Sequence, residues 1–366
     1  MTARLRIALV FGGRSGEHEV SVISARSVAR NLDPERFAVL PCAVDREGRW
    51  ADEATSAALL EDDGTTPDTV APFAGRHALD PRLLAGEVDV VFPVLHGPYG
   101  EDGTIQGLCE MLDLPYVGCG VAASALTMDK VLTKRVLASA GVATARFVAV
   151  GEPEWRGQPA GCAARCRELG LPLFVKPARL GSSVGISKVK SWSELPEAVE
   201  RALVFDDLVI VEEGLDAREI EVAVLGGSPP HASVPGEVVP GHEFYDYADK
   251  YLDNACTLLA PAPLDEDLAA EARRLSVAAF QLLACEGMAR VDFLLERRTS
   301  RLYVNELNAI PGFTAISMYP RLMALSGVGY RELLSRLVEL ALERHTRRRR
   351  FAAAARLPLA ARAAVP

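Results

Sequence analysis

Three apolar segments of the chain each lead into a glycine-rich loop, and this repeated pattern limits the possible folds more than any other feature. The segments Arg6–Phe11, Val88–Leu95 and Leu173–Lys176 have the length and composition of buried strands. A helical pattern over Ser21–Asn31 follows the first of them, so strand and helix alternate early in the chain. This alternation predicts an α/β fold with a parallel sheet, in which the loops after the strands meet the ligand.

Size and composition set the broad class of protein. A chain of 366 residues exceeds what one hydrophobic core supports, so two or three domains are expected. The formal net charge of -9 argues against nucleic-acid binding, and no apolar run in the sequence is long enough to span a membrane. Seven scattered cysteines without a CxxC pair favour a reducing compartment. We therefore expect a cytoplasmic protein that acts on small molecules, with no nucleic-acid or membrane partner, and we interpret residues 1–11 as a strand and not a signal peptide.

The segment Val291–Leu307 has the pattern of a β-hairpin that carries polar groups on one face. If residues 297–300 form the turn, strand alternation sets Asp292 opposite Glu306. Facing carboxylates repel each other, so we expect a cation between them, and oxygen ligands of this kind suit Mg²⁺. The alternative is a surface hairpin with an ordinary ion pair. The polar residues that share this face are Arg290, Asp292, Glu306 and Asn308.

A second candidate site follows the predicted strand that ends at Lys176. The loop Gly181–Ile186 offers backbone N–H groups and serine hydroxyls to phosphate oxygens, but it lacks the spacing of a Walker A loop. The chain has six lysines among its 40 basic residues, and three of them lie beside candidate ligand loops, namely Lys130, Lys176 and Lys250. A compact ammonium suits a phosphate, although a common hairpin turn and chance placement of the lysines are the alternative explanations.

The loops Gly12–Glu19 and His96–Gly103 follow the other two predicted strands. The first is similar to a dinucleotide-binding loop, but its glycine spacing is broken and Glu17 would repel a pyrophosphate. This argues against a dehydrogenase. A carboxylate in that position is better suited to an ammonium ligand. For each loop on its own, ordinary turn glycines and a structural histidine are the alternative interpretation.

Taken in order, these segments resemble the D-alanine:D-alanine ligase family of ATP-grasp enzymes from about residue 4 to residue 345. The resemblance is specific because several separate motifs agree at once. The motifs are Gly12–Ser21, His96–Gly103, Met128–Lys130, Gly181–Gly185, Tyr245–Tyr247, Lys250–Tyr251 and Glu306–Gly312.

The resemblance implies three domains and a tail. An N-terminal doubly wound parallel-sheet domain would span 1–120 and bind substrate, and two ATP-grasp domains would span 121–214 and 215–345. ATP would bind between the sheets of the last two, and the metal and catalytic site would lie in the last. Residues 346–366, which begin with an arginine run, are expected to be disordered.

Such enzymes use ATP to phosphorylate the carboxylate of one D-alanine, and the amine of a second D-alanine attacks the acylphosphate to give D-alanyl-D-alanine for the cell wall. The cofactors implied are ATP and two Mg²⁺ or Mn²⁺ ions, and the implied assembly is a homodimer. The roles implied by position are metal binding by Asp292, Glu306 and Asn308; ATP binding by Lys130, Lys176, Glu212, Leu215, Glu219 and Lys250; substrate binding by His96, Ser317 and Met318; and catalytic contacts by Glu17, Ser182, Tyr251, Arg290 and Gly312.

The resemblance also bears on specificity. The segment Pro240–Ala255 is expected to be a mobile cover over the site, and Tyr251 within it favours D-alanine over D-lactate as the second substrate. Ala309 and Gly214 stand where the family usually has a threonine and where some members have an aromatic, so we expect altered affinity but retained activity. The alternatives are a ligase that joins D-alanine to D-lactate, D-serine or another amino acid, and a nucleotide-binding regulator without turnover.

Overall fold

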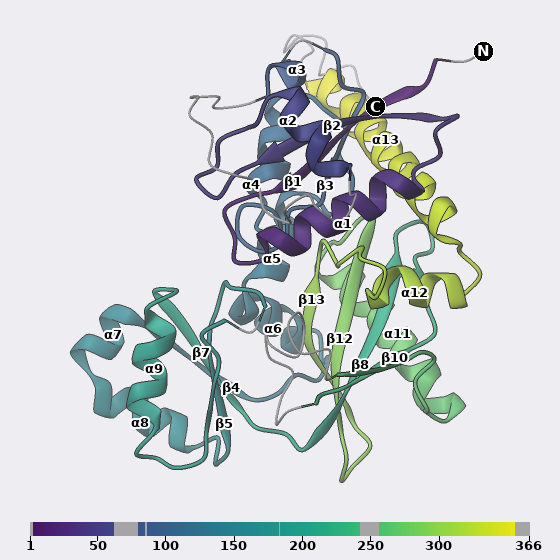
Figure 1. Ribbon diagram of the computed structural model, residues 1–366. Coiled ribbons are helices and arrows are strands. Elements are labelled where there is room, and N and C mark those ends of the chain that lie inside the picture. The colour runs from purple at the N-terminus through teal and green to yellow at the C-terminus, as the bar shows by residue number, and fades with distance from the viewer. Residues whose placement is uncertain (1–2, 62–79, 85, 183, 242–255, 356–366) are drawn as a thin grey trace.

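The computed structural model describes residues 3–61, 80–84, 86–182, 184–241 and 256–355, and these form three lobes, each built on its own sheet (Figure 1). We call them the N-terminal, central and C-terminal lobes. The mixed α/β architecture predicted from the sequence is confirmed. Each sheet falls within one of the predicted segments 1–120, 121–214 and 215–345, whose exact boundaries stay predictions.

The N-terminal lobe carries the predicted parallel sheet, with strand order β2-β1-β3. From Ile7 onward the first strand is buried, as is the whole of the third, because helices cover the sheet, and this explains why both have continuous apolar sequences. The strands are β1 (Leu5–Gly12), β2 (Phe37–Val44) and β3 (Val90–Pro93). The helices are α1 (His18–Asn31), α2 (Glu53–Leu60), α3 (Pro81–Leu84) and α4 (Thr104–Met111).

The Thr-, Asp-, Pro- and Gly-rich sequence of Asp52–Asp80 predicts a long surface excursion or a poorly packed insert, but its first part forms helix α2, whose Leu59 packs in the hydrophobic core. The Asp52 carboxylate accepts a hydrogen bond from the Thr55 N–H at 2.8 Å and so caps helix α2. The helix has only 8 residues, too few to show a helical period in the sequence. Residues 62–79 lie outside the described residues.

The central lobe is a four-stranded antiparallel sheet of order β4-β7-β5-β6, and Figure 1 shows α7, α8 and α9 together on one side of it. Its strands are β4 (Phe147–Gly151), β5 (Leu173–Pro177), β6 (Ser187–Val189) and β7 (Leu208–Glu213). Its helices are α7 (Glu152–Gly157), α8 (Pro159–Arg167) and α9 (Leu195–Leu203).

The helical pattern predicted over Ala122–Ala140 forms two helices, α5 (Val121–Met128) and α6 (Lys130–Ser139). Asp129 separates them because its backbone is extended, with φ -86° and ψ 102°. The Asp129 carboxylate accepts from the Leu132 N–H at 2.9 Å, so it caps the second helix. This break places Lys130 in the first turn of α6.

The C-terminal lobe contains a six-stranded sheet in which the predicted hairpin forms one edge, with order β11-β10-β8-β12-β13 and β9 paired to β8. Its strands are β8 (Ala217–Leu225), β9 (His231–Ala232), β10 (Gly236–Val239), β11 (Thr257–Leu259), β12 (Met288–Glu296) and β13 (Leu302–Asn308). Its helices are α11 (Glu266–Leu282), α12 (Met318–Leu325) and α13 (Tyr330–Ala355).

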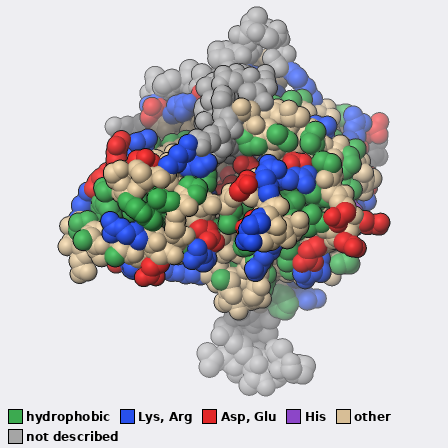
Figure 2. All heavy atoms as spheres, turned by 90° about the horizontal axis from the view of Figure 1, so that it is seen from below, with side chains coloured by type: hydrophobic (Ala, Val, Ile, Leu, Met, Phe, Trp, Pro, Cys, Tyr) green, Lys and Arg blue, Asp and Glu red, His purple; other side chains and the backbone are tan. Residues whose placement is uncertain are grey.

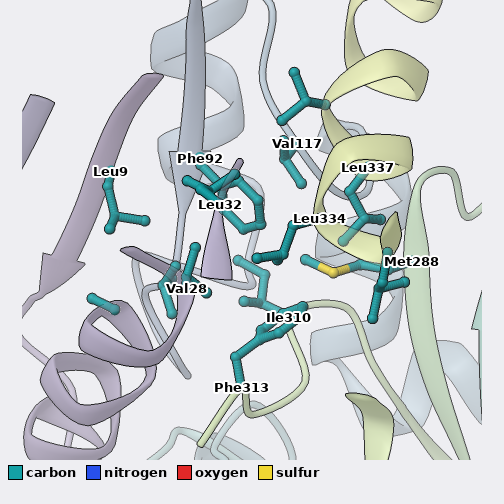
Figure 3. Packing of buried hydrophobic residues seen from close by; sticks show 14 of the residues in the cluster. Leu9, Val28, Leu32, Phe92, Val117, Met288, Ile310, Phe313, Leu334 and Leu337 are labelled. Atoms are coloured by element: carbon teal, nitrogen blue, oxygen red, sulfur yellow. The ribbon is translucent and has the colours of Figure 1, made fainter. Parts of the chain in front are cut away.

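A shared core joins the N-terminal and C-terminal lobes. Leu9 and Phe92 of the parallel sheet belong to one hydrophobic cluster with Ile310 and Phe313, and Figure 3 shows Leu334 of α13 between Phe92 and Ile310. All five side chains are at most 2% exposed. The loop after β13 is therefore anchored in the N-terminal lobe by its own apolar side chains.

The predicted disordered tail, residues 346–366, is wrong in its first part, because α13 continues to Ala355. Its arginines are not simply solvated. Arg344 is buried and donates to the Tyr116 carbonyl at 2.5 Å, while Arg347 pairs with Glu286 and Arg348 with Glu110. Residues 356–366 lie outside the described residues.

Other features agree with the composition. In the part of the chain that the structure describes, all seven cysteines are free thiols, and no helix has the length and apolar character needed to cross a membrane. Figure 2 shows Lys and Arg side chains interspersed with Asp and Glu over the visible face, instead of a continuous basic patch.

Candidate functional site

A cavity of about 530 Å³ lies where the three lobes meet. The N-terminal lobe contributes the loops after β1 and β3, the central lobe contributes the glycine-rich loop after β5, and the C-terminal lobe contributes β12, β13 and the loop that follows. Predicted site residues make up much of its wall: Glu17, His96, Lys130, Ser182, Arg290, Glu306, Asn308, Gly312, Ser317 and Met318.

The polar face of the hairpin has the register that alternation predicts. Asp292 lies opposite Glu306 and Arg290 lies opposite Asn308, with a register shift after Asp292. The Arg290 guanidinium donates two hydrogen bonds of 2.7 Å to the Asp292 carboxylate, and the Asn308 amide donates to the same carboxylate at 2.9 Å. Asp292 is thus fixed in direction by two neighbours on its own hairpin.

A third carboxylate, which the sequence analysis did not single out, lies on the other side of Asp292. Glu221 of β8 pairs in register with Asp292, and its carboxylate is 3.3 Å from the Arg290 guanidinium. Glu221 lies two residues after Glu219, and residues two apart in a strand lie on the same face of the sheet. This spacing is the signal that could have revealed Glu221. Three carboxylates, from Glu221, Asp292 and Glu306, therefore follow one another across neighbouring strands.

Lys130 brings a cation to the free end of this row. Its ammonium donates to the Leu180 carbonyl at 2.8 Å and lies 3.4 Å from the Glu306 carboxylate. Leu180 directly precedes the glycine-rich loop, so Lys130 links that loop to the hairpin. The Glu306 side chain keeps 27% of its surface exposed to the cavity, and it can therefore exchange this partner for a ligand.

The donor set fits a divalent cation only in company with phosphate. No three His, Cys, Asp or Glu side chains form a metal-binding cluster among the residues that the structure describes. Asp292, Glu306 and Asn308 supply two carboxylates and one amide oxygen, all on one face. Mg²⁺ is commonly held by one or two carboxylates together with substrate phosphates and water, so these residues fit such an ion when a nucleotide is bound.

A buried charge cluster lies in the central lobe, behind this face. The Glu212 carboxylate is 2.7 Å from the Lys176 ammonium and 3.0 Å from the Lys134 ammonium. Burial would by itself raise the pKa of Glu212, but the two ammonium groups outweigh it and lower the pKa to about 2. Burial also lowers the pKa of Lys134, whose side chain is fully buried. Glu212 and Lys176 are predicted ATP residues, whereas the role of Lys134 was missed because only the packing of α6 against β7 reveals it.

The glycine-rich loop approaches the N-terminal lobe closely. A Cβ atom at Gly181 would lie 2.8 Å from a carboxylate oxygen of Glu17, so a side chain there would displace that group. The next residue, Ser182, has a φ of 52°, and its hydroxyl is buried without a hydrogen-bond partner among the described residues. A buried hydroxyl that lines a cavity in this way is suited to bind a ligand.

The loop after β3 and the loop after β13 are joined by hydrogen bonds across the lobe boundary. The Glu101 carboxyl accepts from the Gly97 N–H and from the Ile310 N–H, both at 2.8 Å. The His96 Nδ1 lies 2.9 Å from the Ile310 carbonyl oxygen. Burial, together with the charge of Glu17, raises the pKa of Glu101 to about 8, and burial lowers the pKa of His96.

The turn before α12 closes the cavity on the C-terminal side. The Ser317 hydroxyl accepts from the Thr314 N–H at 2.9 Å and lies 2.8 Å from the Thr314 hydroxyl. A Cβ at Gly312 would come within 2.7 Å of the Ser317 oxygen, so only glycine permits this close turn. The N–H of Gly312 and the Ser317 side chain are thereby brought to one wall of the cavity.

The remaining predicted residues do not line this cavity or cannot be placed. Asp292, Lys176, Glu212, Leu215 and Glu219 are absent from its wall among the described residues, although the charge of Glu219 raises the pKa of Lys176. Lys250, Tyr251 and most of the predicted cover Pro240–Ala255 lie outside the described residues.

Comparisons with known proteins agree with one another. The family model described as "D-ala D-ala ligase N-terminus" matches residues 6–119, and the model described as "D-ala D-ala ligase C-terminus" matches residues 136–339. The D-alanine--D-alanine ligase of Chloroherpeton thalassium is 45% identical over 94% of this chain and 98% of its own length. That of a Thermoanaerobacter species is 47% identical over 93% of this chain and 97% of its own.

Two solved structures are similar over the whole fold. The D-alanine-D-alanine ligase from Coxiella burnetii has a TM-score of 0.79 and 34% identity, and the match covers 95% of this chain and 97% of that one. A D-Ala:D-Ser ligase from Enterococcus faecalis has a TM-score of 0.78 and 33% identity, with 93% and 100% covered.

Proposed function

The chain belongs to the D-alanine–D-alanine ligase family, and from this premise we propose that it joins two D-alanine molecules into D-alanyl-D-alanine, converting ATP to ADP and phosphate, for cell-wall synthesis. The observation that carries the proposal is a cavity lined by Glu17, by Lys130 and by Glu306 of the β12–β13 hairpin. It combines groups for an ammonium, for phosphates and for a cation within reach of one another.

The chemistry explains why all three kinds of group are needed. A free carboxylate is a poor electrophile, so the first D-alanine carboxylate attacks the γ-phosphorus of ATP and ADP leaves. The amine of the second D-alanine then attacks the acyl carbon, and phosphate leaves with the former carboxylate oxygen. Both steps gather negative charge on oxygen, which fixed cations and N–H donors stabilise.

For the nucleotide, we assign the phosphates to Lys130, Lys176 and Lys250 and the adenosine to Glu212, Leu215 and Glu219. The buried cluster supports this assignment, because the Glu212 carboxylate holds the Lys176 ammonium at 2.7 Å in a fixed direction. Asp292, Glu306 and Asn308 would hold two Mg²⁺ or Mn²⁺ ions. Such ions, when bound, neutralise charge on the transferred phosphoryl group.

For the substrates, we assign the ammonium of the first D-alanine to Glu17, with His96 close by. The Arg290 guanidinium and the Gly312 N–H would stabilise the oxyanion, and Ser317 with Met318 would bind the second substrate. Ser182 and Tyr251 would complete the cover over the acylphosphate and help to exclude water. The close approach of Gly181 to Glu17 supports a closed arrangement of these loops.

A second candidate is ligation of D-alanine to D-serine, which the similarity to the Enterococcus faecalis enzyme brings into consideration. The predicted role of Tyr251 argues against D-lactate but does not separate D-alanine from D-serine. One added hydroxyl in a small pocket changes binding by only a few kcal/mol, so the two products must be compared directly.

The test is phosphate release from ATP and Mg²⁺ with D-alanine alone and with D-serine or D-lactate added, with the products identified by mass. We expect release with D-alanine alone, a D-alanyl-D-alanine product, and no release with EDTA. Glu306→Gln should lower turnover at least about 100-fold, because it weakens charge stabilisation in phosphoryl transfer. Glu296→Gln is the matched control, because Glu296 lies at the far end of the same hairpin and its side chain contacts the nearby turn residues Arg298 and Thr299.

Each other result has a definite meaning. A mixed dipeptide formed in preference to D-alanyl-D-alanine would keep the mechanism and overturn the specificity. ATP binding without turnover under all conditions would favour a nucleotide-binding regulator. Equal losses in Glu306→Gln and Glu296→Gln would contradict the assignment of the hairpin face to catalysis.

We further propose that the protein works in the cytoplasm as a homodimer. The free cysteines in the described residues and the use of ATP support the location, and the family resemblance supports the dimer. Light scattering of the purified protein would test the assembly.

A further inference from the structure

The backbone of Ile310, in the C-terminal lobe, is held through both of its polar groups by the N-terminal lobe. The Ile310 N–H donates to the Glu101 carboxyl at 2.8 Å, and the Ile310 carbonyl lies 2.9 Å from His96 Nδ1. A third link runs from the Phe313 N–H to the Ser24 hydroxyl at 3.2 Å, and Ser24 also contacts the His96 ring at 3.3 Å. These contacts all join residues more than 70 positions apart in sequence.

The backbone of Ile310 lies in the middle of the proposed site. Ile310 is two positions after Asn308, the proposed metal ligand, and two positions before Gly312, whose N–H we assign to the oxyanion. A shift of this backbone would displace both groups at once. An error of about 1 Å in such a position lowers the rate of a positioned reaction about 100-fold.

The carboxyl of Glu101 is not needed to keep the loop in the fold. The side chains of Ile310 and Phe313 are at most 2% exposed and already anchor the loop in the shared core (Figure 3). Glu101 itself lines the cavity and is only partly buried. The charge of Glu17 disfavours a second negative charge at Glu101, so a neutral side chain at this position would make the folded state more stable than an ionised one.

We propose that Glu101 is a positioning residue for the ligase reaction: its two oxygens tie the Gly97 and Ile310 N–H groups together and so set the backbone that carries Asn308 and Gly312. The proposal rests on the function proposed above. Asp102 provides an internal comparison, because its carboxylate also accepts from two backbone N–H groups, those of Tyr99 and Thr104, at 2.8 and 2.9 Å. Both of those partners belong to its own loop, and neither crosses the lobe boundary.

The test compares Glu101→Gln with Asp102→Asn in the full-length protein. An amide has one acceptor oxygen and one donor nitrogen. In each variant, the amide NH₂ group therefore faces one of the two backbone N–H groups and cannot accept its hydrogen bond. We expect Glu101→Gln to lower kcat about 10- to 100-fold while KM for ATP changes less than about twofold, because the Lys176–Glu212 cluster does not touch this loop. Asp102→Asn should change kcat less than about twofold.

Thermal unfolding of the same variants separates positioning from a general structural role. Glu101→Gln should lose activity with little fall in its melting temperature, since the core anchors Ile310 and Phe313 remain. A matching fall in melting temperature and in the active fraction, with kcat per folded molecule unchanged, would overturn the proposal. So would equal kinetic effects in Asp102→Asn and Glu101→Gln.

A second variant covers the case in which Glu101→Gln does not fold. Ser24→Ala removes the weaker link to Phe313 and keeps every charge, and it should lower kcat a few-fold in the same pattern. An unchanged kcat in Ser24→Ala, with a misfolded Glu101→Gln, would also count against the proposal. An inactive wild-type protein would instead overturn the proposed function, so the two failures are distinguishable.

Discussion

Glu212 is buried in the central lobe and Glu101 is partly buried at the lobe junction, yet their pKa values move in opposite directions. Burial disfavours the charge of each. Two ammonium groups reverse this for Glu212 and lower its pKa to about 2. Glu101 has only backbone N–H groups and the more distant Arg290 in its favour, and the charge of Glu17 adds to burial, so its pKa rises to about 8.

The difference separates two uses of a buried charge. The ion pairs of Glu212 stabilise its charge, and that stability is present above the ordinary carboxyl pKa of about 4.3 and is lost as the pH falls towards 2. The carboxyl of Glu101 destabilises the fold once it is ionised. The first arrangement fixes in advance the surface that we propose for the nucleotide, whereas the second keeps an electrostatically unfavourable group beside the loop that we propose for the reacting atoms.

The largest expected effect comes from removing one ammonium from the central cluster. Lys134→Met leaves Glu212 with Lys176 as its single neighbouring ammonium, and should lower the free energy of unfolding by about 3 kcal/mol, since a buried charge that loses a partner is costly. Denaturant titration measures this. Lys190→Met, at an exposed lysine of the same lobe, is the control and should change stability by less than about 0.5 kcal/mol. Equal losses of stability in Lys134→Met and Lys190→Met would show that a buried lysine of this cluster contributes no more to stability than an exposed one.

How far the sequence predicts these regions depends on the range of the contacts. The register of Asp292 with Glu306 follows from alternation within one hairpin, so it could be predicted and is confirmed. The glycine-rich loop after Lys176 was also found from its local pattern. By contrast, the contact between Lys134 and Glu212 depends on how α6 packs on the central sheet, and no local spacing encodes it.

The same limit explains the errors. The arginines of α13 look like a solvated tail because their partners Glu110 and Glu286 are far away in sequence. Glu101 was recognised as part of a motif but not as a link between lobes, since its partner Ile310 is 209 residues further along. Contacts between residues far apart in the sequence are invisible to periodicity, and Glu212 and Glu101 both depend on such contacts.

An intermediate effect is expected from pH. The pKa of Glu101 is raised from an ordinary value near 4.5 to about 8, so the folded state binds the extra proton in this window and stability falls as the pH rises through it. Besides Glu17, the charged group that acts on this carboxyl is Arg290, which opposes the shift. The melting temperature of Glu101→Gln, relative to wild type, should therefore increase by a few degrees from pH 5 to pH 9. Asp102→Asn should show no such trend. If the difference in melting temperature between Glu101→Gln and wild type stays constant or falls with pH, the pKa of Glu101 is not raised and its contrast with Glu212 is wrong.

The smallest effect is expected at an exposed ion pair that also joins distant segments. The Arg36 guanidinium lies 2.7 Å from the Glu339 carboxylate on α13, with 45% and 48% of the two side chains exposed. Water already stabilises both charges, so Glu339→Gln should lower the free energy of unfolding by less than about 1 kcal/mol, and less still at high salt. The distance is the same as that between Lys176 and Glu212, so a loss as large as that in Lys134→Met would mean that distance, and not burial, sets the strength of these pairs. A small, salt-sensitive loss would mean that burial, and not distance, makes the Glu212 ion pairs strong and the charge of Glu101 unfavourable.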